Sequence, residues 1–337
     1  MLTSTETPWP VVGHDWAVDH LRRGMANRRV RHAYLFLGPE SIGKLTLARA
    51  FAAALNCAHD DLQHRPCGAC SACQRIASGN HPDVIYAQPD PATGTLKIEE
   101  VRSITARIAL KPFEARFRIA ILPSFERAQP RAQDALLKTL EEPPPHAILI
   151  LTAPSSEPIL PTIISRSQVL RLRPLPPDLV ATILEARFGA DRETALLLGR
   201  ISGGRLGWAI EALTDPDRLL ARREALDLLA RLLFQNRTAR FEEAEKLARE
   251  KAELTALLDL WQMFWRDALL MAAGAGMPIA NIDRREELAT LVERTTAAEI
   301  LTALRATQAA LAALNTNANA RLAVEVMLLD YPGLRSA

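Results

Sequence analysis

The stretch HAYLFLGPESIGKLTLARAFAAAL, residues 32–55, decides the fold of the first part of the chain. It opens with an apolar run at 33–38, typical of a buried strand, and closes with an alanine- and leucine-rich run, typical of a helix. Between them Gly38, Gly43 and Lys44 meet the spacing G-x-x-x-x-G-K. In such a turn backbone N–H groups point at bound phosphates from a helix N-terminus, and the lysine adds a positive charge. The stretch therefore predicts a phosphate-binding loop between a strand and a helix.

The residues that would handle magnesium beside this loop are replaced. A hydroxyl normally follows the lysine, but Leu45 stands there, and we expect it to pack beneath the loop. An acidic pair normally ends a neighbouring strand, but the strand expected at 118–122 is followed by Pro123 and Ser124. We interpret Glu126, further on, as a solvated side chain. These losses predict that the chain does not hydrolyse ATP itself, and they leave binding of ATP or ADP open.

Short apolar runs alternate with helical patterns as far as about residue 175. Strands and helices that alternate in this way predict a mostly parallel sheet with helices on both faces. Beyond the prolines at 174, 176 and 177 the strand signals end, and amphipathic helical patterns continue to about residue 330. We expect an α/β domain over 1–175, a small helical domain over 176–214 and a helical domain over 215–337. The runs typical of buried strands are 33–38, 83–88, 118–124, 147–154 and 168–175.

Composition narrows the class of protein. The chain has 337 residues, 48% of them hydrophobic, which suits two or three domains with packed cores. The first residues lack the pattern of a signal peptide, and no run of about 18 apolar residues could cross a membrane. We therefore expect a cytoplasmic protein with no membrane partner. A formal net charge of +2 does not decide about nucleic acid, so the arginines at 22–31 are either a DNA contact or a solvated helix face.

All the cysteines of the chain lie in one short window, and three of them form two successive C-x-x-C steps. Four thiolates close a tetrahedral zinc shell and leave no position open for catalysis. We expect a structural zinc module over 57–73, with an iron–sulfur cluster as the rival and His59 or His64 as substitute ligands. The expected ligands are Cys57, Cys67, Cys70 and Cys73.

Together these features resemble one family, the delta prime subunits of the bacterial DNA polymerase III clamp loader, which are relatives of the AAA+ ATPases. The resemblance extends over nearly the whole chain. It is carried by RRVRHAYLFLGPESIGK, by CGACSACQRIASGNHPDV, and by the distinctive blocks DALLKTLEEPP (134–144) and ILPTIISRS (159–167). The segment 314–331, LNTNANARLAVEVMLLDY, resembles the closing helix of the family's collar domain. The resemblance implies an AAA+-like P-loop domain, a helical lid domain and an all-α collar domain that joins subunits, in the order given above.

The same resemblance assigns roles to single residues. Relatives carry an arginine finger that reaches into the ATP site of a neighbouring subunit, and the matching motif here is Ser165-Arg166-Ser167. Arg166 is thus identified as a finger that acts in trans and stabilises charge on the transferred phosphoryl group. The sensor arginine of active relatives aligns with Gly207, and Thr152 either matches a sensor hydroxyl or caps a strand end.

The resemblance implies a scaffold subunit in a ring with ATPase subunits and a delta-like subunit. The ring would load the sliding clamp onto primer–template DNA during replication, and nucleotidyltransferase activity would belong to the whole polymerase. An autonomous magnesium-dependent AAA+ ATPase is one alternative, which the missing acidic pair disfavours. A zinc-dependent nucleic-acid-binding module is another, which the near-neutral charge and the lack of aromatic residues among the cysteines disfavour.

Overall fold

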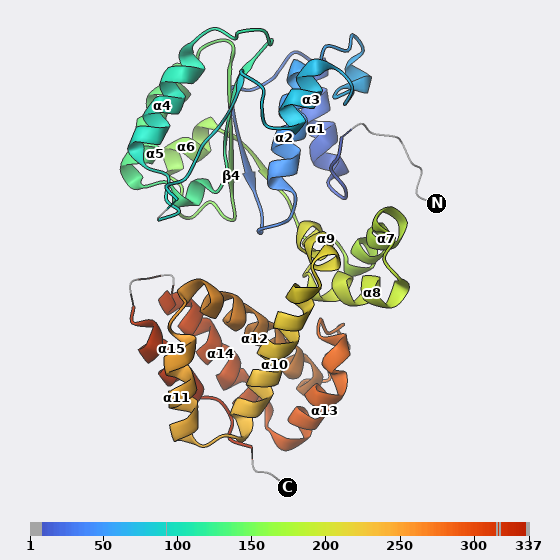
Figure 1. Cartoon of the computed structure of the whole chain (residues 1–337), viewed down its shortest axis with the longest axis vertical. Coiled ribbons are helices and arrows are strands. Elements are labelled where there is room, and N and C mark those ends of the chain that lie inside the picture. Colours follow the sequence, from blue (N-terminus) through green and yellow to red (C-terminus); the bar gives the residue numbers. More distant parts are fainter. Residues whose placement is uncertain (1–8, 92, 315, 317, 335–337) are drawn as a thin grey trace. The chain divides into compact units, whose positions relative to one another are not determined.

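The computed structural model describes residues 9–334 except 92, 315 and 317 (Figure 1). The chain divides into two compact units: the first comprises residues up to 175 with 205–207, and the second comprises 176–204 with the residues from 208 onward. Residues 1–8, where the signal-peptide pattern is missing, lie outside the described part. The finer division of the helical region at residue 214 stays a prediction.

A parallel sheet forms the centre of the first unit, in the strand order β2-β3-β4-β1-β5. Each strand falls inside one of the five predicted runs and ends before the proline or turn residues that close the run. The predicted mostly parallel sheet is therefore confirmed. The strands are β1 (Ala33–Leu37), β2 (Val84–Tyr86), β3 (Arg118–Leu122), β4 (Ala147–Ala153) and β5 (Gln168–Arg171).

Helices cover both faces of this sheet, because alternate residues of a strand point to opposite faces. Tyr34 and Phe36 of β1 join the core under α1, α2 and α3, whereas Leu35 and Leu37 join the core under α4, α5 and α6 (Figure 1). Two 3-10 turns, η1 (Leu62–His64) and η2 (Phe125–Arg127), complete the unit. The helices are α1 (Asp15–Ala26), α2 (Lys44–Asn56), α3 (Ser71–Ala77), α4 (Ile98–Ala109), α5 (Pro130–Glu141) and α6 (Pro161–Arg166).

The arginine-rich segment near the N-terminus is only partly helical. Arg22 and Arg23 lie on α1, but the helix ends at Ala26, so Arg28, Arg29 and Arg31 follow it in the connection to β1. A solvated helix face therefore accounts for Arg23, whereas Arg22 is half-buried and its Nη2 donates to the Gln63 carbonyl oxygen at 3.1 Å.

A buried carboxylate fixes the turn between α4 and β3. Asp83 is fully buried, and its two oxygens accept hydrogen bonds from the backbone N–H groups of Phe113, Glu114 and Ala115 at 2.7–3.0 Å. Burial alone would raise the pKa of the Asp83 carboxyl, but the three N–H donors and Arg118 outweigh it and hold the pKa below its ordinary value. The charged form of Asp83 is thus built into the fold.

Within the described residues, every regular element of the second unit is a helix. Trp261, Phe264 and Trp265 lie in its core. No helix in the described part of the chain is long and apolar enough to span a membrane. The unit contains η3 (Ile282–Arg284) and the helices α7 (Pro177–Phe188), α8 (Arg192–Ile201), most of α9 (Leu206–Thr214), α10 (Pro216–Phe234), α11 (Arg237–Leu247), α12 (Lys251–Ala272), α13 (Arg285–Arg294), α14 (Ala297–Leu314) and α15 (Ala320–Leu329).

The segment 314–331 is not a single closing helix. Leu314 ends α14, and α15 begins only at Ala320, where the side chain of Asn319 caps it by accepting a hydrogen bond from Leu322 N–H. Positions 315 and 317 of the predicted helix lie outside the described residues.

We expect Asp83→Asn to destabilise the first unit by about 2–3 kcal/mol, because an amide cannot accept hydrogen bonds with both terminal atoms. Since the folded pKa of Asp83 is depressed, its contribution is present above the ordinary carboxyl value of 3.8 and is lost as the pH falls through the lower folded value. Urea unfolding at pH 7 and below pH 3.8 measures both effects. Asp134→Asn, an exposed change on α5, serves as the control and should alter stability by less than about 0.5 kcal/mol. Equal stability of the two variants at pH 7 would contradict this role of Asp83.

Candidate functional site

The phosphate loop lies between the end of β1 and the start of α2. Gly38 follows the last residue of β1 with φ 149°, and a Cβ built there would come within 2.6 Å of the Leu172 carbonyl oxygen. Gly43 caps α2 in the left-handed region, with φ 107°. Both glycines are therefore required by the backbone itself, whether or not a phosphate binds.

The lysine of the loop is turned onto the loop's own backbone. Lys44 Nζ donates to the carbonyl oxygens of Gly38 at 2.5 Å and Pro39 at 2.7 Å. Burial lowers the pKa of the Lys44 ammonium, while the nearby carboxylates of Glu126 and Glu40 oppose this shift. Two of the three ammonium protons are thus used inside the loop, which leaves less of the charge for a phosphate.

Leu45 lies as the sequence predicts, whereas Glu126 does not. Leu45 is half-buried against the core beneath α2, which confirms that it packs under the loop. The interpretation of Glu126 as solvated is wrong: its side chain is 15% exposed, and its Oε2 atom is buried without a hydrogen-bond partner among the described residues. Burial raises the pKa of Glu126, although Arg127 and Lys44 lower it in part. The cause is the turn η2, in which buried Phe125 holds the segment inward and carries Glu126 with it.

A second segment packs directly on the phosphate loop. Gly207 N–H donates to the Ser41 carbonyl oxygen at 2.8 Å, and a Cβ at position 207 would come within 2.6 Å of the same oxygen. Ser41 itself has a left-handed backbone, with φ 55°. Position 207, where the resemblance places a sensor arginine, is therefore held in a backbone contact that has no room for a side chain.

Two further side chains support the loop region. Thr152 is buried in β4, and its hydroxyl oxygen accepts a hydrogen bond from Ser124 N–H at 3.3 Å, which favours the strand-end role over a free sensor hydroxyl. His14 is buried with Nε2 at 3.0 Å from the Ile42 carbonyl oxygen, and burial lowers its pKa. No sequence periodicity singles out His14, because this contact joins residues 28 positions apart.

Arg166 lies at the amino-terminal end of the parallel strands, whereas the phosphate loop lies at their carboxyl-terminal end. It ends α6 just before β5, and the pairing of Tyr34 with Gln168 sets Arg166 six residues behind Gly38, or roughly 20 Å along the strand direction. Its guanidinium pairs with Glu141 Oε1 at 2.9 Å and donates to the Thr162 carbonyl oxygen at 3.2 Å. The side chain of Arg166 remains 36% exposed, so it is accessible to another molecule.

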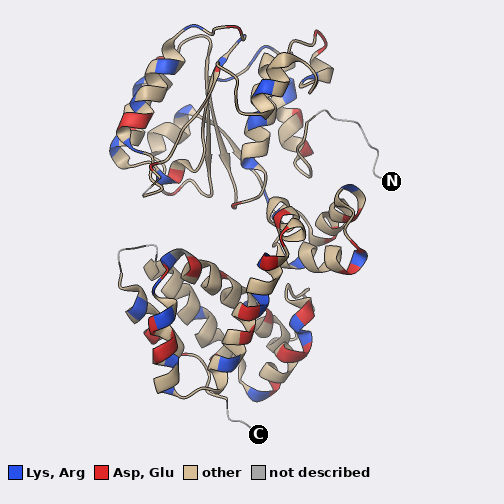
Figure 2. Cartoon of the chain, viewed as in Figure 1, with Lys and Arg blue, Asp and Glu red and all other residues tan. Residues whose placement is uncertain are grey.

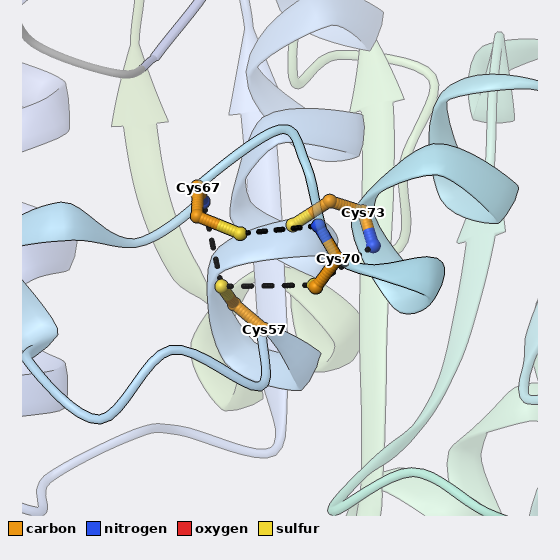
Figure 3. Close-up of side chains that lie close together, drawn as sticks. All are labelled: Cys57, Cys67, Cys70 and Cys73. Atoms are coloured by element: carbon orange, nitrogen blue, oxygen red, sulfur yellow. Dashed lines mark hydrogen bonds between the residues drawn. The ribbon is translucent and has the colours of Figure 1, made fainter.

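The cysteines converge on one point (Figure 3). Cys57 lies at the end of α2, Cys67 and Cys70 on the following loop, and Cys73 on α3, with all sulfur atoms within 4.8 Å of one another. A tetrahedral Zn²⁺ with about 2.3 Å zinc–sulfur bonds needs sulfurs about 3.8 Å apart, close to the 4.0 Å between Cys57 Sγ and Cys70 Sγ. The residues present therefore fit a structural zinc ion.

Backbone N–H groups point at these sulfurs, as a thiolate cluster requires. Cys67 N–H donates to Cys57 Sγ at 3.4 Å, and Cys70 N–H donates to Cys67 Sγ at 3.3 Å. Burial alone would raise the pKa of the Cys70 thiol, but the N–H donors and neighbouring thiols bring it to about 6. His59 and His64 bond instead to Asp61 and do not belong to the four-thiol group.

Two family models match the chain. A model described as DNA polymerase III, delta subunit matches residues 13–176, and one described as DNA polymerase III, delta subunit, C terminal matches residues 216–332. The two matches together take in both the α/β part and most of the helical part.

Curated relatives match between 47% and 61% of the chain. The DNA polymerase III subunit tau/gamma of Haemophilus influenzae is 36% identical over 165 residues, which are 49% of this chain and 23% of that protein. The subunit tau of Bacillus subtilis is 37% identical over 47% of this chain and 27% of its own length. The subunit tau of Escherichia coli is 33% identical over 61% of this chain and 32% of its own length. The chain thus spans less than a third of the length of these relatives.

Solved structures with a related outline include two from Thermotoga maritima. A DNA polymerase III gamma subunit-related protein gives a TM-score of 0.37 at 17% identity, over 93% of this chain and 97% of that one. The Holliday junction branch migration motor RuvB gives 0.41 at 15% identity, over 65% of this chain and 64% of that one. With scores this low, the fold assignment rests on the strand order of the chain itself.

We expect the purified chain to contain about one zinc ion, and Cys57→Ser or Cys73→Ser to lose most of it, because three thiolates leave the tetrahedral shell open. His64→Ala, a change at an exposed neighbour, is the matched control and should keep the metal. Elemental analysis of the three variants beside the unchanged chain measures this. Iron in place of zinc, or equal metal loss from His64→Ala, would contradict the four-thiol zinc assignment.

Proposed function

Because the chain belongs to the clamp-loader family of DNA polymerase III subunits, we propose that it is a delta prime-like subunit that assists a neighbour's ATP site. In this proposal the chain does not hydrolyse ATP, and Arg166 is the arginine finger that completes the site of an adjacent ATPase subunit. The assembly uses that ATP to load a sliding clamp onto primed DNA during replication.

The single observation that carries the proposal is the separation of Arg166 from the phosphate loop. Gly38 and Lys44 follow the carboxyl end of β1, whereas Arg166 precedes the amino end of the adjacent strand β5. A guanidinium at the amino end of the strands cannot reach phosphates held by its own loop. It can reach phosphates of another chain that packs against this end of the sheet. Thr162 accepts from Nη1 and Glu141 from Nη2, so each terminal nitrogen of the guanidinium keeps a second N–H for another partner.

The state of the phosphate loop supports the absence of turnover. Lys44 donates to loop carbonyls, Leu45 offers no oxygen to a metal, and Gly207 fills the place of a sensor arginine. Glu126 is a single buried carboxyl four residues past the end of β3, where an active site would have two acids at the strand end. Any ATP or ADP held by Gly38, Gly43 and Lys44 would then be bound without being consumed.

The thiol cluster and the last helix support a scaffold role. Zinc on the four thiolates would tie the end of α2 to α3 and stiffen the unit without taking part in chemistry. On α15, Leu322, Val326 and Leu329 follow an i, i+4, i+7 spacing and are 57%, 54% and 46% exposed. Side chains at this spacing share one face of a helix, so this apolar face suits contact with another subunit in a collar of helices.

The proposed partners are ATPase subunits and a delta-like subunit in one cytoplasmic ring, with the clamp and primer–template DNA reached through the assembly. An autonomous ATPase is less well supported, because the lysine, the hydroxyl and the sensor position of its site are all compromised. A separate nucleic-acid module built on zinc is also less well supported, because the cysteines hold α2 to α3 inside the unit.

We expect Arg166→Ala to slow ATP turnover at the neighbouring site by about 10³-fold, because the charge on the transferred phosphoryl group loses its stabilising partner. In a reconstituted loader the total ATPase rate should fall by roughly the share of that site, and clamp loading should fall with it. Arg166→Lys should recover only part of the activity, since an ammonium lacks the planar fork. Arg131→Ala on α5, an exposed arginine, is the control and should change neither rate. Normal ATPase and clamp loading with Arg166→Ala would refute the finger.

A further inference from the structure

Glu126 lies at the same end of the sheet as the phosphate loop. It belongs to the turn η2 after β3, while the loop follows β1, and β4 is the strand between them. Hydrogen bonds to β4 fix both turns: Ser124 N–H donates to the Thr152 hydroxyl at 3.3 Å, and Gly38 N–H donates to the Ala153 carbonyl oxygen at 3.1 Å. Since neighbouring strands are about 4.8 Å apart, the two turns begin roughly 10 Å from each other.

Four charged side chains meet between these turns, two positive and two negative. The guanidinium of Arg127 lies between the acids, with Nε 3.7 Å from Glu126 Oε1 and Nη2 4.0 Å from Glu40 Oε1. Glu40 belongs to the phosphate loop, and both carboxylates act electrostatically on the ammonium of Lys44. Figure 2 shows acidic and basic residues mixed near the carboxyl ends of the strands. The charges of the four groups cancel, whereas a site that attracts phosphate needs an excess of positive charge.

One oxygen of the Glu126 carboxylate has no partner among the described residues. The side chain is 15% exposed, yet Oε2 is buried and accepts no hydrogen bond from them. Burial raises the pKa of Glu126, whereas the charges of Arg127 and Lys44 favour its ionised form. A phosphate oxygen cannot satisfy this carboxylate, because both groups are hydrogen-bond acceptors. A phosphate in the loop would therefore face an ionised oxygen that repels it.

The lysine of the loop is already bonded to the loop backbone. Lys44 Nζ donates to the carbonyl oxygens of Gly38 and Pro39 at 2.5 and 2.7 Å. A bound phosphate would have to draw the ammonium away from these carbonyls, and it would bring further negative charge beside the two carboxylates. The backbone is not the obstacle, since Gly38 and Gly43 keep the turn and the helix start that a phosphate-binding loop requires. The charge of the acidic side chains is therefore the feature that decides whether a phosphate binds.

We propose that Glu126, assisted by Glu40, is the internal counter-ion of the phosphate loop and excludes nucleoside di- and triphosphates from it. In this role the carboxylate neutralises Lys44 as a phosphate otherwise would. The inference rests on the proposed function and deepens it. The missing metal hydroxyl and acidic pair account for the absence of turnover, and Glu126 adds a residue that prevents binding. Removal of its charge alone should open the loop to nucleotide without restoring hydrolysis.

The test measures ADP binding to the purified full chain by isothermal titration calorimetry, for the unchanged chain and for Glu126→Gln. We expect the dissociation constant for ADP to fall at least about tenfold in Glu126→Gln, because two charges roughly 10 Å apart in a partly buried site interact this strongly. The amide also offers an N–H to a phosphate oxygen, so Glu126→Ala should recover binding less completely. Addition of Lys44→Ala to Glu126→Gln should abolish the gain, which locates the ADP in the loop.

Two matched changes separate this role from a general effect of charge. Glu40→Gln should lower the dissociation constant by only about threefold, because Glu40 is 73% exposed and its charge is screened. Glu142→Gln removes the same charge at an exposed position after α5, at the amino end of the strands, and should change the dissociation constant by less than about twofold. Urea unfolding of each variant measures stability, and Glu126→Gln should unfold no more easily than the unchanged chain, since an unpartnered buried charge is removed.

Three results would overturn the counter-ion: ADP binding by Glu126→Gln no tighter than by the unchanged chain, an equal gain from Glu142→Gln, or a loss of stability without a gain in binding, as a merely structural carboxylate would give. ATP hydrolysis is recorded on the same samples, which separates this inference from the proposed function. Magnesium-dependent turnover by the unchanged chain contradicts both. Unaltered ADP binding in Glu126→Gln, with no turnover in either chain, contradicts the counter-ion alone.

Discussion

The direction of parallel strands is the constraint on which the rest of the structure depends. Strands β1 and β5 are neighbours and run parallel. The turn after β1 therefore lies at the carboxyl end of the sheet, and the turn before β5 lies at its amino end. The phosphate loop lies at the carboxyl end and Arg166 lies at the amino end. Under the proposed function, one chain offers half of a nucleotide site at each end of the sheet, and two chains bring a loop and an arginine together.

The two ends of the sheet differ in how many of their polar groups are already bonded within the chain. At the carboxyl end, Gly207 N–H and Lys44 Nζ donate hydrogen bonds to carbonyl oxygens of the phosphate loop. These carbonyl groups therefore have partners without a phosphate. At the amino end, Glu141 and Thr162 orient the guanidinium of Arg166, which keeps further N–H donors for another partner. Carboxylates at a helix C-terminus are ordinarily unfavourable, and the pairing of Glu141 with Arg166 offsets that cost at the end of α5. The asymmetry suits a subunit that serves a neighbour's site and has lost its own.

Local patterns predicted the elements well, and contacts between distant segments account for the misses. The strands followed from apolar runs closed by turn residues. Glu126 was misplaced because its burial depends on Phe125 closing a turn against the α4–α6 face, which no periodicity encodes. The contact of Gly207 with Ser41 joins residues far apart in sequence, and only the fold supplies its steric reason. The helix expected over 314–331 begins late because Asn319 caps α15.

The central claim is that the phosphate loop keeps its shape without catalysing turnover, and ATP hydrolysis by the purified chain alone tests it most directly. Magnesium-dependent hydrolysis is measured for the unchanged chain and for Lys44→Ala, with nucleotide binding recorded on the same samples. We expect hydrolysis at the background rate for both, whether or not nucleotide binds. Turnover above background that requires magnesium and is abolished by Lys44→Ala would contradict it.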